Sequence, residues 1–180
     1  TPQYLQSNWS LGSNSTRSLL NNNFIFSDST TKFSPLIAAQ SIHQNYDYPI
    51  STSVQLLYTL NGVLRPLCSG TVVSKNKVLT AKHCFYNAST KMFIDSIWVA
   101  PCRDNGSLHP DFQISRVINY YMFKTALSFA LDDDIGLLEV NDNLGDKTGW
   151  LGFSYVGDTS FFKDRPLHKF SYPHSSFDTS

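Results

Sequence analysis

The segment at residues 68–84, CSGTVVSKNKVLTAKHC, limits the possible folds of this chain more than any other stretch. Two apolar, β-branched runs, at residues 72–73 and 78–80, flank the polar stretch 75–77. This pattern predicts two antiparallel strands joined by a tight turn. The second strand leads directly into Ala-Lys-His-Cys, so His83 stands beside a cysteine at the end of a buried strand.

A second stretch, residues 132–140, complements the first, because three consecutive acids run straight into an apolar strand. Together the two stretches resemble the histidine and aspartate motifs of the chymotrypsin-like serine proteases. Their order along the chain, His83 and then Asp134 about fifty residues later, is the order of that family. The resemblance extends over residues 42–173 and implies the fold and chemistry of that family.

Finer features resemble the glutamyl-endopeptidase-like branch of the family. They are Tyr48-Pro49 ahead of the first strand, Gly-Trp-Leu-Gly at residues 149–152, and Phe-Ser-Tyr-Pro at residues 170–173. Lys82 stands where trypsins commonly have alanine, a replacement that this branch tolerates.

The resemblance implies roles for four residues. His83 would act as the catalytic base, and Asp134 would hold its tautomer and stabilise the imidazolium ion. Cys68 and Cys84 would form a disulfide, worth ~2–4 kcal/mol of stability. From the residues alone, the alternatives are a structural turn histidine and two buried free thiols. Cys102 is left over, either free or paired with a cysteine outside this sequence.

The family's nucleophilic serine has no counterpart in this sequence. The nearest string to its Gly-Asp-Ser-Gly loop is Gly-Asp-Thr-Ser at residues 157–160, which comes too early and lacks the final glycine. We therefore expect a trypsin-like serine endopeptidase without its serine-bearing segment, inactive by the triad mechanism as this chain alone. The alternative is a non-catalytic binding or structural protein built on a protease scaffold.

Composition excludes several other classes of function. The chain has 180 residues, 41% of them hydrophobic and 16% charged, with a formal net charge of zero. A neutral chain without a long apolar run is not expected to bind nucleic acid or a membrane. The adjacent acids 132–134 lack the spacing of a calcium loop, and the histidines lack metal-ligand spacing. We expect no metal and no cofactor.

The strand pattern predicts an all-β, chymotrypsin-like, six-stranded antiparallel barrel followed by an incomplete second barrel. The expected strands are residues 53–60, 66–74, 77–80, 92–100, 113–121 and 134–140, with a polar linker at 142–147.

Three regions are expected along the chain. Residues 1–40, rich in Ser, Asn and Thr, would be a pro-segment or extension, residues 41–147 the N-terminal barrel, and residues 148–180 the truncated start of the second barrel. Besides a peptide or protein substrate, we expect a further C-terminal segment or second chain to pack on residues 150–180. A disulfide would indicate a secreted, extracellular protein.

Overall fold

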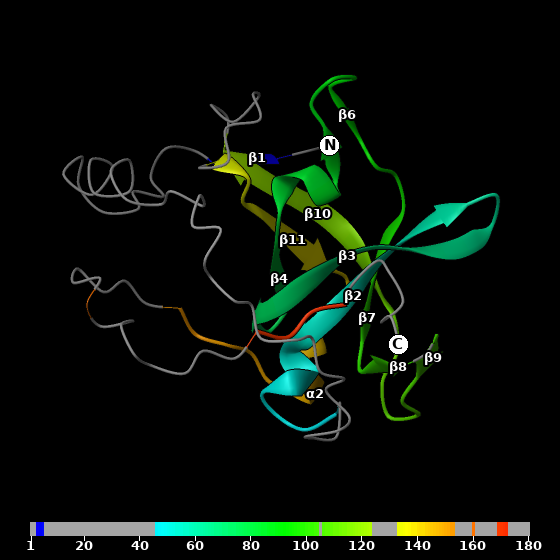
Figure 1. Ribbon diagram of the computed structural model, residues 1–180, viewed down its shortest axis with the longest axis vertical. Coiled ribbons are helices and arrows are strands. Elements are labelled where there is room, and N and C mark those ends of the chain that lie inside the picture. Colours follow the sequence, from blue (N-terminus) through cyan, green and yellow to red (C-terminus); the bar gives the residue numbers. More distant parts are fainter. Residues whose placement is uncertain are drawn as a thin grey trace, which may run out of the picture.

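The computed structural model describes residues 46–104, 106–123, 133–153, 160 and 169–172, and the backbone of residues 3–5. Six strands close into an antiparallel barrel in the order β10-β11-β4-β3-β2-β7, and β7 pairs back to β10 (Figure 1). This arrangement confirms the predicted six-stranded barrel. The strands are β2 (Ser53–Leu60), β3 (Val63–Ser74), β4 (Lys77–Thr80), β7 (Ile97–Pro101), β10 (Ser115–Phe123) and β11 (Gly136–Val140).

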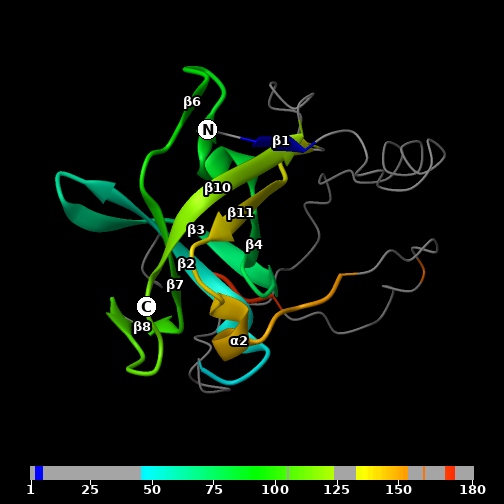
Figure 2. The same cartoon turned by 180° about the vertical axis from the view of Figure 1, so that it is seen from behind.

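Shorter elements lie outside the six barrel strands. β1 (Gln3–Leu5) runs parallel to the end of β10, and α2 (Leu144–Thr148) lies at the opposite end of the barrel in both views (Figures 1 and 2). Two small hairpins pair β5 with β6 and β8 with β9. The remaining bounds are β5 (Tyr86–Asn87), β6 (Met92–Phe93), β8 (Arg103–Asp104), β9 (Ser107–Leu108), and the 3₁₀ turns η2 (Ile50–Thr52) and η3 (Lys82–Cys84).

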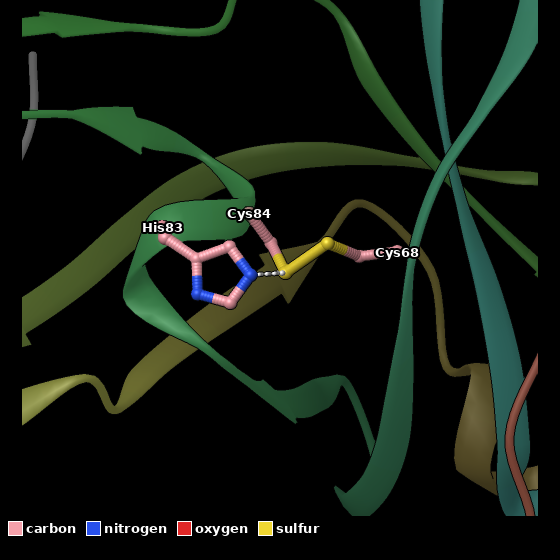
Figure 3. A group of neighbouring side chains, drawn as sticks. All are labelled: Cys68, His83 and Cys84. Carbon is pink, nitrogen blue, oxygen red and sulfur yellow. Dashed lines mark hydrogen bonds between the residues drawn. A yellow bond between two sulfur atoms is a disulfide. The ribbon is translucent and has the colours of Figure 1, made fainter. Parts of the chain in front are cut away.

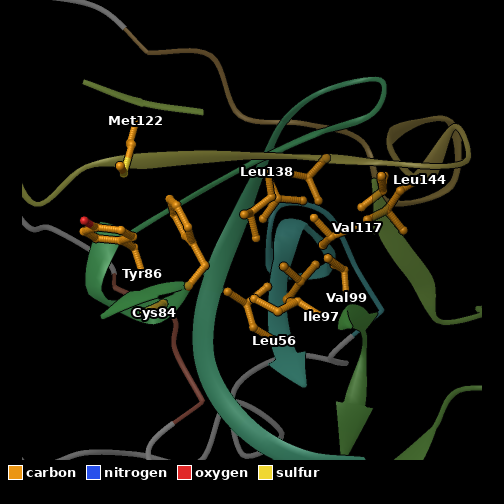
Figure 4. Close-up of a cluster of buried hydrophobic side chains, with 14 residues drawn as sticks. Leu56, Cys84, Tyr86, Ile97, Val99, Val117, Met122, Leu138 and Leu144 are labelled. Atoms are coloured by element: carbon orange, nitrogen blue, oxygen red, sulfur yellow. The ribbon is translucent and has the colours of Figure 1, made fainter. Parts of the chain in front are cut away.

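The barrel interior is an apolar core to which every barrel strand contributes (Figure 4). Alternate residues of a strand point to one face, so the period-2 pattern of the sequence places one set of side chains inside. The segment after β4 contributes to the same core, and this attaches η3 firmly to the barrel. The buried members are Val54, Leu56, Val72, Val78, Cys84, Phe85, Tyr86, Ile97, Val99, Val117, Met122, Leu138, Val140 and Leu144.

The predicted strands are confirmed with some shifts in their ends. β2 and β4 have the predicted bounds, whereas β3 begins at residue 63 instead of 66. The turn between β2 and β3 is at Asn61 and Gly62, both with positive φ, as a two-residue hairpin requires. The single strand predicted at 92–100 is divided into β6 and β7, because Ser96 adopts a left-handed φ of 56° that interrupts the pleat.

The predicted linker at residues 142–147 is wrong in part. Residues 144–148 form the short helix α2, whose Leu144, Gly145 and Thr148 are buried. Gly145 packs so tightly that a side chain there would meet the backbone of Ser74 and Lys75 and the ring of Trp150.

A short C-terminal piece docks on the barrel. The Ser69 hydroxyl accepts the Tyr172 backbone N–H at 2.7 Å and donates to the Tyr172 carbonyl at 3.2 Å. Within residues 149–153 and 169–172 the structure has no strand, and the rest of the predicted second barrel lies outside the described residues, as does most of the region 1–40. Among the described helices, none has the length and apolar character needed to cross a membrane.

Candidate active site

The histidine stands on η3, the tight turn that follows β4. The turn closes with the N–H of Cys84 donating to the Ala81 carbonyl at 3.1 Å and that of Phe85 donating to Lys82 at 3.1 Å. It directs Cys84 and Phe85 into the core, where both are almost fully buried. The His83 side chain, one residue before Cys84, is directed outward and remains 54% exposed, so solvent and other molecules can reach its ring.

The acid reaches the same place from the start of β11. β11 pairs antiparallel with β4, with Gly136 opposite Thr80, so the residues just before β11 lie next to η3. The Lys82 N–H donates to the Asp134 carbonyl at 3.4 Å and extends this pairing into the turn. The ladder therefore brings Asp134 beside His83 without any special loop.

Asp134 holds His83 through two separate hydrogen bonds. One carboxylate oxygen, Oδ2, lies 2.7 Å from Nδ1 of the His83 ring, and the other, Oδ1, accepts the His83 backbone N–H at 2.9 Å. With an ionised Asp134, Nδ1 carries the proton, and Nε2 of the neutral ring keeps a free lone pair. The arrangement fixes both the orientation and the tautomer of the imidazole.

The electrostatics keep Asp134 ionised. Burial alone would raise the pKa of this carboxyl. The hydrogen bonds from the His83 ring and backbone, and the positive charges of His83 and Lys82, outweigh burial and hold the pKa below its usual value. At neutral pH the carboxylate can therefore stabilise a positive charge that develops on the ring.

The predicted disulfide is confirmed. Cys68 and Cys84 are joined, with their Cα atoms 6.0 Å apart, so β3 is tied to the histidine turn. The Cys84 sulfur lies 3.7 Å from Nε2 of His83 (Figure 3). Cys102 is buried and takes no part in a disulfide, and burial raises the pKa of its thiol to about 12. Its sulfur is thus uncharged and poorly reactive.

The structure brings together all four residues predicted from the sequence. Of the neighbouring acids, Asp132 lies outside the described residues. Two further residues of the site, Lys82 and Gly136, were not assigned roles from the sequence. Lys82 is fully buried beside His83, and Gly136 provides the space for the ring of Phe85. The sequence signal for Lys82 was present, since a lysine in a run of buried residues is unusual.

Comparison with known proteins agrees with this fold. The Trypsin family profile matches residues 40–162, and the chain belongs to the Trypsin family. The glutamyl endopeptidase of Bacillus licheniformis is 30% identical over 89 residues, which are 49% of this chain and 28% of that protein. The extracellular metalloprotease of Bacillus subtilis is 31% identical over 93 residues, which are 52% of this chain and 29% of that protein. The chain thus spans under a third of the length of these relatives.

Two solved structures show the same fold. A Glu endopeptidase in complex with MPD aligns with a TM-score of 0.54 and 20% identity, over 63% of this chain and 50% of that one. The protease Anisep from Arthrobacter nicotinovorans aligns with a TM-score of 0.50 and 20% identity, over 62% and 53%. The chain is therefore a trypsin-like serine protease relative of the glutamyl-endopeptidase-like kind.

Proposed function

We propose that this chain supplies the base and acid half of a serine endopeptidase. A serine hydroxyl attacks the peptide carbonyl carbon while Nε2 of His83 takes its proton. The same proton then passes to the leaving amine, and a water repeats the sequence to release the acyl group. Asp134 stays ionised throughout and balances the charge of the His83 imidazolium.

The observation that carries this proposal is the double contact between Asp134 and His83. One carboxylate oxygen contacts the ring, and the other contacts the backbone of the turn that carries the ring. Because Asp134 also accepts the His83 backbone N–H, the ring and its turn are held together, and Nε2 is the ring nitrogen left without a proton. This preorganisation is what a general base needs before the transition state forms.

We propose that the nucleophilic serine comes from a further C-terminal segment or second chain that packs on residues 150–180. Exposed apolar side chains at the start of this region support the proposal, because Trp150 is 48% exposed and Phe153 is 70% exposed. The sequence itself contains no Gly-Asp-Ser-Gly-like loop. In this proposal residues 41–147 form the N-terminal barrel, residues 148–180 begin the second, and residues 1–40 form a pro-segment or extension.

The relatives suggest the substrate and the location. One of them is named a glutamyl endopeptidase, so peptides with a glutamate before the cleaved bond are the first substrates to test. Another is named an extracellular protein, and the disulfide between Cys68 and Cys84 is the kind that persists in an oxidising compartment. We propose that this chain acts outside the cell.

The name of the Bacillus subtilis relative raises a metal-dependent mechanism as the second candidate. Among the described residues, the one group able to gather around an ion is Cys68, His83 and Cys84, and two of these are joined in a disulfide. In contrast, His83 has the carboxylate partner of a serine-protease base. These contacts favour the serine mechanism.

Fluorophosphonate labelling and hydrolysis of quenched glutamyl peptides test the proposal. We expect residues 1–180 combined with the proposed C-terminal segment or second chain to label at one serine and to cleave the peptides, and residues 1–180 alone to do neither. His83→Ala and Asp134→Asn should lower kcat by about 10⁴-fold, whereas His109→Ala, at another loop histidine, should leave it unchanged. If the folded protein with that added segment or chain shows neither labelling nor turnover, the result would favour the non-catalytic alternative.

A further inference from the structure

Three metal-ligating atoms meet at the proposed base. The sulfurs of Cys68 and Cys84 and a ring nitrogen of His83 all lie within 4.8 Å of one another. Cys84 Sγ and His83 Nε2 are 3.7 Å apart (Figure 3). The disulfide brings the two sulfurs together, and His83 precedes Cys84 in the chain. The peptidase chemistry uses the disulfide only as a brace and His83 only as a base, so it makes no use of their ability to bind a metal.

We propose that reduction of the Cys68–Cys84 disulfide converts this group into a zinc site with two cysteine ligands, one histidine ligand and a fourth position open to solvent. While the disulfide is intact, neither sulfur is a thiolate, and the ion has no adequate set of ligands. The site therefore exists in one redox state only.

The distances fit tetrahedral zinc. Zn–S bonds of ~2.3 Å and Zn–N bonds of ~2.0–2.1 Å at tetrahedral angles place the ligand atoms about 3.4–3.8 Å apart. The 3.7 Å between Cys84 Sγ and His83 Nε2 already falls in this range. The Cα atoms of Cys68 and Cys84 are 6.0 Å apart, so small rotations of the two side chains can separate the sulfurs once they are no longer bonded.

The carboxylate partner that a zinc-bound histidine needs is also in place. A zinc-bound histidine usually donates its other ring N–H to a carboxylate, which fixes the tautomer and makes the ligand more basic. Asp134 holds Nδ1 of His83 at 2.7 Å, and this leaves Nε2 toward the sulfurs. The half-exposed His83 side chain gives an ion access from solvent, while the buried Cys84 anchors the site to the core.

The chemistry balances with a phosphine as reductant. The phosphine is oxidised to its oxide, taking the oxygen of one water, while the disulfide gains two electrons and the two protons of that water to become two thiols. Zinc binding then releases both thiol protons, so two thiolates, a neutral imidazole and Zn²⁺ form an uncharged site. Zinc takes the lone pair of Nε2 that the proposed base would use, so the reduced, metal-bound protein would be blocked as a peptidase.

The test uses the whole chain carrying Cys102→Ala, which leaves only two of the three cysteines. The protein is reduced with a water-soluble phosphine and titrated with Co²⁺, which shows tetrahedral absorption and a sulfur-to-metal charge-transfer band, and then with Zn²⁺. We expect one Co²⁺ per chain, displaced by one Zn²⁺, in the reduced protein alone. Equal binding by the oxidised protein, or no binding by the reduced one, would overturn the proposal.

Variants distinguish a zinc site that includes His83 from zinc binding by the two cysteine thiols alone. His83→Ala should weaken Zn²⁺ binding by at least about tenfold, and Asp134→Asn by ~10–100-fold, whereas the loop variant His109→Ala should bind normally. Circular dichroism follows the fold of each reduced form. Because a poorly folded variant could mislead, alkylation of the thiols provides a second measurement. Zinc should protect both cysteines in the parent and not in His83→Ala, and equal protection in the two would refute the histidine ligand.

Discussion

The ring of Phe85 lies directly against Gly136, and this contact joins the two segments that carry the proposed catalytic pair. Phe85 follows His83 by two residues, and Gly136 follows Asp134 by two. A Cβ atom on Gly136 would overlap Cε1 and Cζ of the Phe85 ring. The distance between His83 and Asp134 thus depends on a glycine that has no chemical role of its own.

Gly136→Ala should therefore damage both stability and the site. The added methyl must displace a fully buried ring in a packed core, which typically costs about 1–3 kcal/mol of unfolding free energy. Urea unfolding measures the loss, and NMR of the His83 ring reports whether Asp134 still holds it. Gly152→Ala is the matched control, because a Cβ there meets no atom within 4 Å. Equal stabilities of the two variants would contradict the packing argument.

Much of this arrangement could be predicted from the sequence. Strict alternation predicted β2, and the apolar run after Lys77 predicted β4. Motif resemblance indicated His83, Asp134 and the cysteine pair. The contact of Phe85 with Gly136 was beyond sequence reasoning, because it joins residues that are distant in the chain and shows no local pattern.

Helix α2 escaped prediction for a different physical reason. Its sequence, Leu-Gly-Asp-Lys-Thr, has the composition of a loop and is too short for helical periodicity. Tertiary contacts stabilise it instead, since Gly145 donates its N–H to the Lys75 carbonyl at 2.8 Å and Leu144 enters the core. The closure of the barrel by β7 and β10 likewise depends on pairing between distant strands.

The outer face of the barrel carries a network centred on Glu139. Its carboxylate accepts hydrogen bonds from Tyr121 at 2.6 Å, Lys77 and Asn119 at 2.9 Å, and Asn76 at 3.2 Å. The bonds from Tyr121, Lys77 and Asn119 lower the pKa of Glu139 to about 2, against a small opposing effect of burial. Because the charged form is favoured in the folded state, Glu139 stabilises the fold above its ordinary pKa.

That contribution should be lost as pH falls from about 5 toward 2, because the unfolded chain then binds a proton that the folded chain resists. Glu139→Gln should cost ~1–2 kcal/mol at pH 7 and nothing near pH 2. Chemical unfolding over this pH range checks the slope. Asp146→Asn removes the exposed ion pair with Lys75 and should change stability by under about 0.5 kcal/mol at any pH. A Glu139→Gln protein with the parent's pH slope would be inconsistent with the network's role.

The disulfide should contribute mainly by restricting the unfolded chain. Cys68 and Cys84 are 16 residues apart, and closing a loop of this length stabilises by about 3 kcal/mol. The double variant Cys68→Ala/Cys84→Ala should lose about that amount in urea unfolding. The reduced parent, without metal, should unfold at nearly the same urea concentration as this variant. If reduction does not change the stability of the parent, the disulfide does not contribute to the free energy of unfolding.

Lys82 should help to keep Asp134 ionised, in addition to the larger effect of the hydrogen bonds from His83. It is fully buried, its N–H donates to the Asp134 carbonyl, and its positive charge is one of the effects that lower the Asp134 pKa. Lys82→Met keeps most of the side-chain volume and removes that charge, so the pKa of Asp134 should rise. A carboxyl whose pKa is lowered in the folded state stabilises the fold at pH values above its pKa in the unfolded chain, and this stabilisation is lost as the pH falls. In Lys82→Met this loss should therefore begin at a higher pH, and the hydrogen bond to His83 should break with it.

Carbon NMR of the Asp134 carboxyl through an acid titration measures the shift directly. Lys147→Met, at an exposed lysine on α2, is the matched control and should leave the titration unchanged. If a folded Lys82→Met protein titrates like the parent, Lys82 is only a packing residue.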